Sequence, residues 1–126
     1  MMAWILVVDD NPTNLKLLTY VVQRSGHQVD TALDAETAQR RIRDHRPDLI
    51  LLDLDLPRID GFQLARRLKA DSQTKDIVII AVTAFAMQGD ADRARAAGCD
   101  DYVTKPIDTR AFPALLDRHL DRVRTS

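Results

Sequence analysis

The chain has 126 residues, the length of one domain of ordinary size. Apolar residues make up 45% and charged residues 29%, proportions that are typical of globular proteins and exclude general disorder. A net charge of -1, from 18 basic and 19 acidic residues, indicates no nucleic-acid partner. No apolar run approaches the ~18 residues of a membrane span, so we also expect no membrane partner.

The cysteine content and the N-terminus indicate a cytoplasmic location. Cys99 is the single cysteine, so it cannot form an internal disulfide, and a reducing compartment fits best. The first ten residues lack the basic flank and cleavage site of a signal peptide. We interpret Cys99 as a small buried residue, and His27, His45 and His119 as solvated or capping residues without metal-ligand spacing.

Five short runs of apolar and β-branched residues predict β-strands. The runs are Trp4–Val8, Val29–Ala32, Leu49–Leu52, Ile77–Val82 and Tyr102–Thr104. The third and fourth runs are apolar at every position, which is typical of parallel strands covered by helices on both faces.

Helix start and stop signals follow each of these runs. Asn11 and Pro12 begin the first helix and Gly26 ends it, while Asp34 caps the second. The remaining predicted helices are Gly61–Ala70, Ala86–Ala97 before Gly98, and a last segment capped by Asp108. Five strand–helix units in succession predict an α/β fold with a doubly wound, five-stranded parallel sheet and five helices.

Polar residues follow four of the five predicted strands. Asp9 and Asp10 follow the first, Asp53 the third, Thr83 the fourth and Lys105 the fifth. Taken singly, each is typical of a turn or a strand end. Because ligands of open parallel sheets bind beyond the carboxyl ends of the strands, the joint occurrence predicts one shared site.

The residue types of this predicted site favour phosphoryl chemistry. Three crowded carboxylates repel one another, which favours a divalent cation or a raised pKa. Oxygen ligands suit magnesium, or manganese, better than zinc. A metal, an ammonium and a hydroxyl together can stabilise a phosphoryl group, and a carboxylate can accept one. The chain has four glycines and no Gly-rich nucleotide cradle, so we expect a donor other than a nucleotide bound here.

The segments around these positions resemble the receiver domains of two-component response regulators. The matching segments are Val7–Asn11, Leu51–Gly61, Val82–Ala84, Gly98–Tyr102 and Lys105–Pro106. The resemblance implies a single receiver domain over residues 1–126 with a core of about 4–122, and a flavodoxin-like strand order 2-1-3-4-5. It is nearest to receivers of hybrid histidine kinases and to stand-alone cell-cycle regulators.

The resemblance also implies the phosphorylated residue and its metal ligands. Asp53 would be the phosphoacceptor and a ligand of magnesium (or manganese). Asp10 would bind the metal directly and Asp9 mainly through water, and the backbone carbonyl of Asp55 would be a further ligand. Asp55 and Phe85 would flank the phosphoryl group, and we hypothesise that they alter its rate of hydrolysis.

The remaining site residues would act on the phosphoryl group after transfer. By the same resemblance, Lys105 would pair with it, next to a cis peptide bond at Pro106. Thr83 and Tyr102 would form the switch. Phosphorylation would then change a protein-interaction surface.

The implied partners are a histidine kinase or a histidine phosphotransfer protein, and a downstream protein target. Leu15, Leu17 and Ile107 are candidates for the docking patch of a phosphotransfer protein, with partial burial as the alternative. We expect a monomer or a weak phosphorylation-dependent dimer, either stand-alone or part of a hybrid kinase.

A second interpretation is an enzyme. Asp53-Leu54-Asp55 after an apolar strand is similar to the nucleophile and acid of haloacid-dehalogenase-type phosphatases. Against it, the motif continues with Leu56 instead of Thr or Val, and the Asp9–Asp10 pair precedes the nucleophile. We therefore expect a phosphoacceptor signalling domain and no enzyme beyond its own phosphotransfer and slow dephosphorylation.

Overall fold

Strands and helices alternate along the whole chain. The computed structural model describes residues 2–56, 61–83 and 89–125. The strands are β1 (Trp4–Val8), β2 (Gln28–Ala32), β3 (Leu49–Asp53), β4 (Val78–Thr83) and β5 (Asp101–Thr104). The helices are α1 (Pro12–Arg24), α2 (Ala35–Asp44), α3 (Gly61–Ala70), α4 (Asp90–Ala96) and α5 (Phe112–Thr125).

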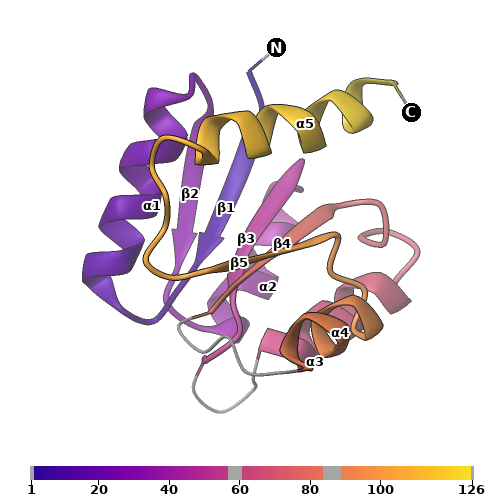
Figure 1. Ribbon diagram of the computed structural model, residues 1–126. Helices are drawn as coiled ribbons and strands as arrows, with labels where there is room; N and C mark the ends of the chain where they lie inside the picture. Colours follow the sequence, from indigo (N-terminus) through magenta and orange to yellow (C-terminus); the bar gives the residue numbers. More distant parts are fainter. Residues whose placement is uncertain (1, 57–60, 84–88, 126) are drawn as a thin grey trace.

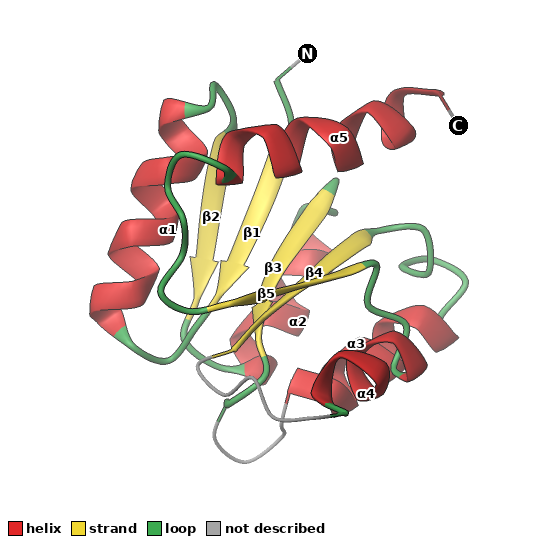
Figure 2. Cartoon of the chain, in the orientation of Figure 1, coloured by secondary structure: helices red, strands yellow, loops and turns green. Residues whose placement is uncertain are grey.

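The strands form one parallel sheet in the order β2-β1-β3-β4-β5 (Figure 2). This order confirms the predicted doubly wound architecture. All strands run in one direction, so their carboxyl ends share one edge of the sheet. That edge carries the candidate site.

Helices cover both faces of the sheet and bury a separate hydrophobic cluster on each. Helices α1 and α5 lie over one face, and α2, α3 and α4 lie over the other (Figure 1). Leu18, Val22 and Leu116 are buried between the sheet and α1 and α5. Ala38 and Leu64 are buried on the opposite face. Strands β3 and β4 are buried at every position, as their continuous apolar sequence predicts.

The predicted element boundaries differ from the observed ones in a few places. Strands β2, β3 and β5 are each one residue longer than predicted, and β3 includes Asp53. Strand β4 is shifted by one residue and includes Thr83. Helix α4 begins at Asp90, whereas Ala86 was the expected start; residues 86–88 lie outside the described part, and Gly89 has a left-handed backbone with φ +93°. The Asp108 carboxylate accepts N–H bonds from the turn before α5, which itself begins at Phe112.

The helices differ in how their first turns are capped. The Asn11 side chain accepts two backbone N–H bonds at the start of α1, and Asp34 accepts one from Thr37 at the start of α2. Helix α4 has seven residues, and its N-cap, Gly89, provides no side-chain hydrogen bond. Among the described residues, no helix is both long and apolar enough to cross a membrane.

Two of the three histidines are buried, whereas solvated or capping positions were expected for all three. His27 is 7% exposed, and its Nδ1 accepts the backbone N–H of Ala3. His119 is 5% exposed and lies 2.8 Å from Asp101 Oδ2. Burial raises the pKa of Asp101, but the hydrogen bonds from His119 and from the Tyr102 backbone outweigh it, so the net pKa is lowered. The two imidazoles therefore form hydrogen bonds with the Ala3 backbone N–H and with the Asp101 carboxylate.

Gly61 allows the start of α3 to pass against the end of β3. A Cβ atom at this position would lie 2.5 Å from the Asp53 carbonyl oxygen and 2.6 Å from Leu54 Cα. Both are backbone atoms, so the chain itself would have to move. The glycine thus fixes the path of the segment that carries Asp53.

We expect Gly61→Ala to lower the free energy of unfolding by about 1–3 kcal/mol, because overpacking forces a backbone shift. Urea denaturation measures this loss. Arg66→Ala, at an exposed position of the same helix, is the control and should change stability by no more than about 0.5 kcal/mol. Equal stability of wild type and Gly61→Ala would contradict the close approach.

Candidate functional site

Strand register brings the predicted site residues together. Val8 of β1 pairs with Leu52 of β3, so the residues that follow them, Asp9 and Asp53, lie side by side at the carboxyl ends of these strands. Asp53 in turn pairs with Val82 of β4. Thr83 pairs with Thr104, immediately before Lys105. Residues far apart in the sequence therefore meet at one sheet edge.

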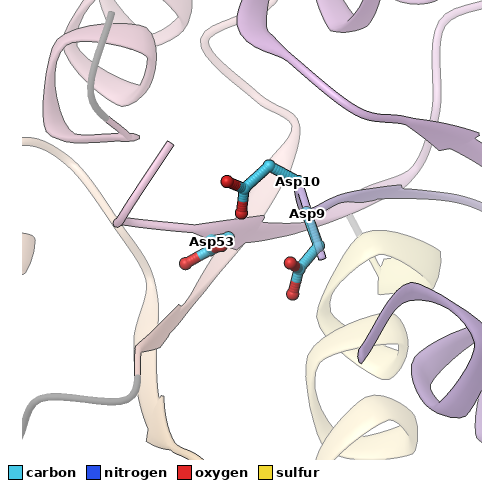
Figure 3. A group of neighbouring side chains, drawn as sticks. All are labelled: Asp9, Asp10 and Asp53. Carbon is cyan, nitrogen blue, oxygen red and sulfur yellow. The ribbon is translucent and has the colours of Figure 1, made fainter. Parts of the chain in front are cut away.

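Three carboxylates gather between the ends of β1 and β3. Ligand-capable atoms of Asp9, Asp10 and Asp53 all lie within 4.8 Å of one another (Figure 3). Asp9 is fully buried and Asp53 is 2% exposed, while Asp10 is exposed. Two of these negative charges are thus shielded from water, which makes their mutual repulsion strong.

Lys105 supplies positive charge to this acidic group. Its Nζ lies 3.1 Å from Asp9 Oδ2 and 3.6 Å from Asp53 Oδ2. The Lys105–Pro106 peptide bond is cis, and the Lys105 N–H donates to the Thr83 carbonyl at 2.7 Å. The ammonium is therefore shared between two carboxylates, and its backbone is tied to the end of β4.

Asp53 is held in an environment that disfavours its charge. Its Oδ1 accepts the backbone N–H of Asp55 at 3.0 Å. Burial raises the pKa of Asp53 to about 6; the Asp55 N–H opposes this rise, the charge of Asp9 adds to it, and Lys105 opposes it. An added positive charge at this position would therefore be favourable.

Thr83 and Tyr102, the predicted switch pair, lie at the end of β4 and near the start of β5. Thr83 is 3% exposed, and its hydroxyl donates to Asp55 Oδ2 at 3.1 Å. Tyr102 is half-buried and packs against the cluster beneath α2, α3 and α4. Phe85 lies outside the described residues. Sequence reasoning placed Asp55 beside the phosphoryl group but missed its contact with Thr83.

The three candidate docking residues differ in exposure. Leu17 is 39% exposed, whereas Leu15 is half-buried against the core. Ile107 is 9% exposed and belongs to the core cluster beneath α1 and α5. In this conformation Leu17 supplies most of the accessible apolar surface among the three.

The site has donors that suit a hard divalent cation. Its carboxylates are oxygen ligands, which magnesium prefers. Asp9 Oδ1 accepts the Asn11 N–H, while Oδ2 is buried without a well-aligned hydrogen bond from the described residues. A buried carboxylate oxygen in this state can serve as a ligand directly or through water. The residues present therefore fit a magnesium ion.

Comparison with known proteins identifies the family. The model of the response regulator receiver domain matches residues 5–117. The chain belongs to this family. It is therefore a receiver domain of the kind used in two-component signalling, and the resemblance drawn from the sequence is confirmed.

Relatives and solved structures agree with this assignment. The polar-differentiation response regulator DivK of Brucella anthropi is 39% identical over 92% of this chain and 94% of its own length. DivK of Brucella ovis is 38% identical over the same shares. The receiver domain of a sensor histidine kinase from Pseudomonas aeruginosa PAO1, described with a magnesium ion coordinated in its active site cleft, is 33% identical with a TM-score of 0.87. The alignment covers 96% of this receiver and 99% of that chain.

A receiver domain from a histidine kinase of Syntrophus aciditrophicus shows the same architecture. It is 31% identical with a TM-score of 0.90, covering 98% of this chain and 94% of that one. The predicted flavodoxin-like receiver fold is thus confirmed by its structural neighbours.

The raised pKa of Asp53 predicts a pH-dependent stability in metal-free protein. The folded state holds the Asp53 proton more tightly than the unfolded state, so wild type loses stability as the pH rises from about 4 to above 6. Asp53→Asn removes the buried charge. We expect its stability relative to wild type to be greater at high pH than at low pH, by about 2 kcal/mol.

Urea denaturation in EDTA at low and high pH measures this difference. Asp44→Asn, at an exposed position of α2, is the matched control and should show little pH-dependent change. An Asp53→Asn effect of the same size at both pH values would contradict the unfavourable charge.

Proposed function

We propose that Asp53 is the phosphoacceptor of a two-component phosphorelay, and that its phosphorylation depends on magnesium. The observation that supports this most directly is the placement of a buried carboxylate between two further acids and a shared ammonium. Such a group binds a cation tightly and then presents one carboxylate to an incoming phosphoryl group. The donor would be a histidine kinase or a histidine phosphotransfer protein.

The proposed transfer requires little from the protein besides orientation and charge. A carboxylate oxygen of Asp53 forms a bond to phosphorus as the bond from phosphorus to the donor imidazole nitrogen breaks, which leaves an acyl phosphate and a neutral histidine once a proton is taken up. Asp9, Asp10, Asp53 and the Asp55 carbonyl would hold the magnesium ion. When bound, that ion neutralises charge on the transferring oxygens. Lys105 would pair with the phosphoryl group as its salt bridges to the carboxylates rearrange.

The proposed output is a shift between two conformations. Thr83 would donate its hydroxyl proton to the phosphoryl group, and Tyr102 would move inward behind it. Phosphorylation adds negative charge at Asp53, so it favours whichever conformation delivers more donors to that charge. The surface around α4 and β5 would change, and a downstream protein would recognise it.

We further propose how the domain meets its partners. Leu17, with Leu15 and the more buried Ile107 beside it, would contact the phosphotransfer protein near the site. The unit would be a single domain over residues 1–126 with a core of about 4–122, acting in the cytoplasm. It would be monomeric or would dimerise weakly on phosphorylation.

Acetyl phosphate tests the acceptor directly. With magnesium present, we expect the intact mass of the protein to rise by one phosphoryl group, and we expect EDTA or Asp53→Asn to prevent this because the metal or the acceptor is lost. Asp44→Asn, the exposed control on α2, should be phosphorylated like wild type. Phosphorylation of the Asp53→Asn variant to the wild-type level would overturn the assignment.

The same preparation separates a switch from a phosphatase. A phosphoacceptor forms one acyl phosphate per chain, whereas a haloacid-dehalogenase-type enzyme turns over repeatedly. We expect no sustained hydrolysis of p-nitrophenyl phosphate. Steady turnover that is lost in Asp53→Asn would favour the enzyme.

We also propose that Asp55 and Phe85 set the lifetime of the acyl phosphate. Both follow a site residue by two positions, so their side chains would flank the phosphoryl group. We expect Asp55→Asn or Phe85→Ala to change the half-life of the phosphorylated protein about threefold or more. Half-lives equal to wild type in both variants would end this hypothesis.

A further inference from the structure

The Asp55 side chain contacts Thr83, which suggests a role for Asp55 in the switch besides those proposed above. We propose that the Asp55 carboxylate is a positioning residue that engages the Thr83 hydroxyl before phosphorylation and so competes with the phosphoryl group for it. The proposal rests on the proposed function, in which Thr83 donates to phosphorylated Asp53. It concerns the starting state of the switch.

Backbone hydrogen bonds to β4 and to Asp53 position the chain from which the Asp55 side chain reaches Thr83. Leu54 N–H donates to the Val82 carbonyl at 3.0 Å, so the chain after Asp53 remains bonded to β4. Asp55 N–H is in turn bonded to Asp53 Oδ1. With its backbone anchored in this way, Asp55 accepts the Thr83 hydroxyl through Oδ2 at 3.1 Å.

The competition follows from the hydroxyl having a single proton. A threonine side chain donates one hydrogen bond, so it cannot fully serve the carboxylate and a phosphoryl oxygen together. The bond to Asp55 has an anionic acceptor, and bonds of that kind are about twice as strong as neutral ones. Thr83 is 3% exposed, so water cannot readily replace the hydrogen bond to Asp55 once it breaks. The switch therefore has to break an existing bond before it forms the new one.

The size of this effect is limited by the exposure of Asp55. Thr83 is buried, but Asp55 is exposed, so the carboxylate is rehydrated when the bond breaks. We expect the bond to reduce the apparent affinity for a phosphoryl mimic by about threefold to tenfold, because binding must first displace it.

A double-mutant cycle separates this competition from simple charge repulsion. Removal of the Asp55 charge should favour an anionic mimic whether or not Thr83 is present. The positioning effect exists only when the hydroxyl is present. The measurement is the affinity of beryllofluoride in magnesium, by calorimetry, for wild type, Asp55→Ala, Thr83→Ala and the double variant.

We expect Asp55→Ala to tighten beryllofluoride binding by about threefold to tenfold more in the wild-type background than in the Thr83→Ala background. Asp55→Asn keeps an amide oxygen that can accept the hydroxyl, so it should tighten binding less than Asp55→Ala. Equal tightening in both backgrounds would overturn the proposal and leave charge repulsion as the cause.

A metal-free measurement provides an independent readout. In EDTA and without beryllofluoride, Asp55→Ala should change the χ1 couplings and the methyl chemical shift of Thr83 in NMR spectra, because the hydroxyl loses its acceptor. Unchanged Thr83 signals would also overturn the proposal. If wild type fails to bind beryllofluoride, or if Asp53→Asn binds it equally well, the proposed function fails, whereas the metal-free NMR result still decides whether Asp55 positions Thr83.

Discussion

The repulsion among the acids at the end of β1 and β3 is the constraint on which the site depends. Asp9 and Asp53 are both removed from water, and the charge of Asp9 disfavours the charged form of Asp53. Burial of two like charges costs free energy unless an opposite charge compensates it. Here Lys105 gives partial relief, since one ammonium is divided between two carboxylates. The site therefore favours the addition of further positive charge.

The free energy gained by folding of the parallel sheet offsets the cost of burying these charges. Asp53 is the last residue of β3 and Asp9 follows β1 directly, and the other residues of these two strands are apolar and almost all buried. Lys105 follows β5, which lies at the edge of the sheet and is only partly buried. Hydrophobic clusters on both faces stabilise those strands independently of the site. Backbone bonds such as Lys105 N–H to the Thr83 carbonyl then hold the strand ends in fixed relation. Stability comes from the layers, and chemistry is confined to one edge.

Much of this arrangement could be predicted from the sequence because it follows from strong local patterns. The apolar runs of β3 and β4 predicted strands covered on both faces, and the polar residues at the strand ends identified the site edge, whereas the strand order came from the resemblance to receiver domains. The Thr83–Asp55 contact could not be predicted, since it depends on the register between two strands and on one side-chain rotamer. The burial of His119 has a local signal, because helical spacing places it with Leu116 and Leu120 on the apolar face of α5. Its partner, Asp101, lies on a different element and has none. The structure gives α4 from Asp90 with Gly89 as its N-cap in a left-handed backbone, and the expected start at Ala86 lies outside the described residues.

The weak start of α4 has a consequence for how the fold can respond. Side chains cap α1 and α2, whereas the N-cap of α4 is Gly89, which costs roughly a few tenths of a kcal/mol relative to such a cap. Helix α4 also has only seven residues, and short helices are less stable. We therefore expect the N-terminal turn of α4 to unwind at a lower free-energy cost than the first turns of α1 and α2. Gly89 has φ +93°, so a serine or aspartate at this position could cap α4 only after the backbone left the left-handed region. The strength of this turn is thus decided at one position that lies apart from the charged groups of the sheet edge.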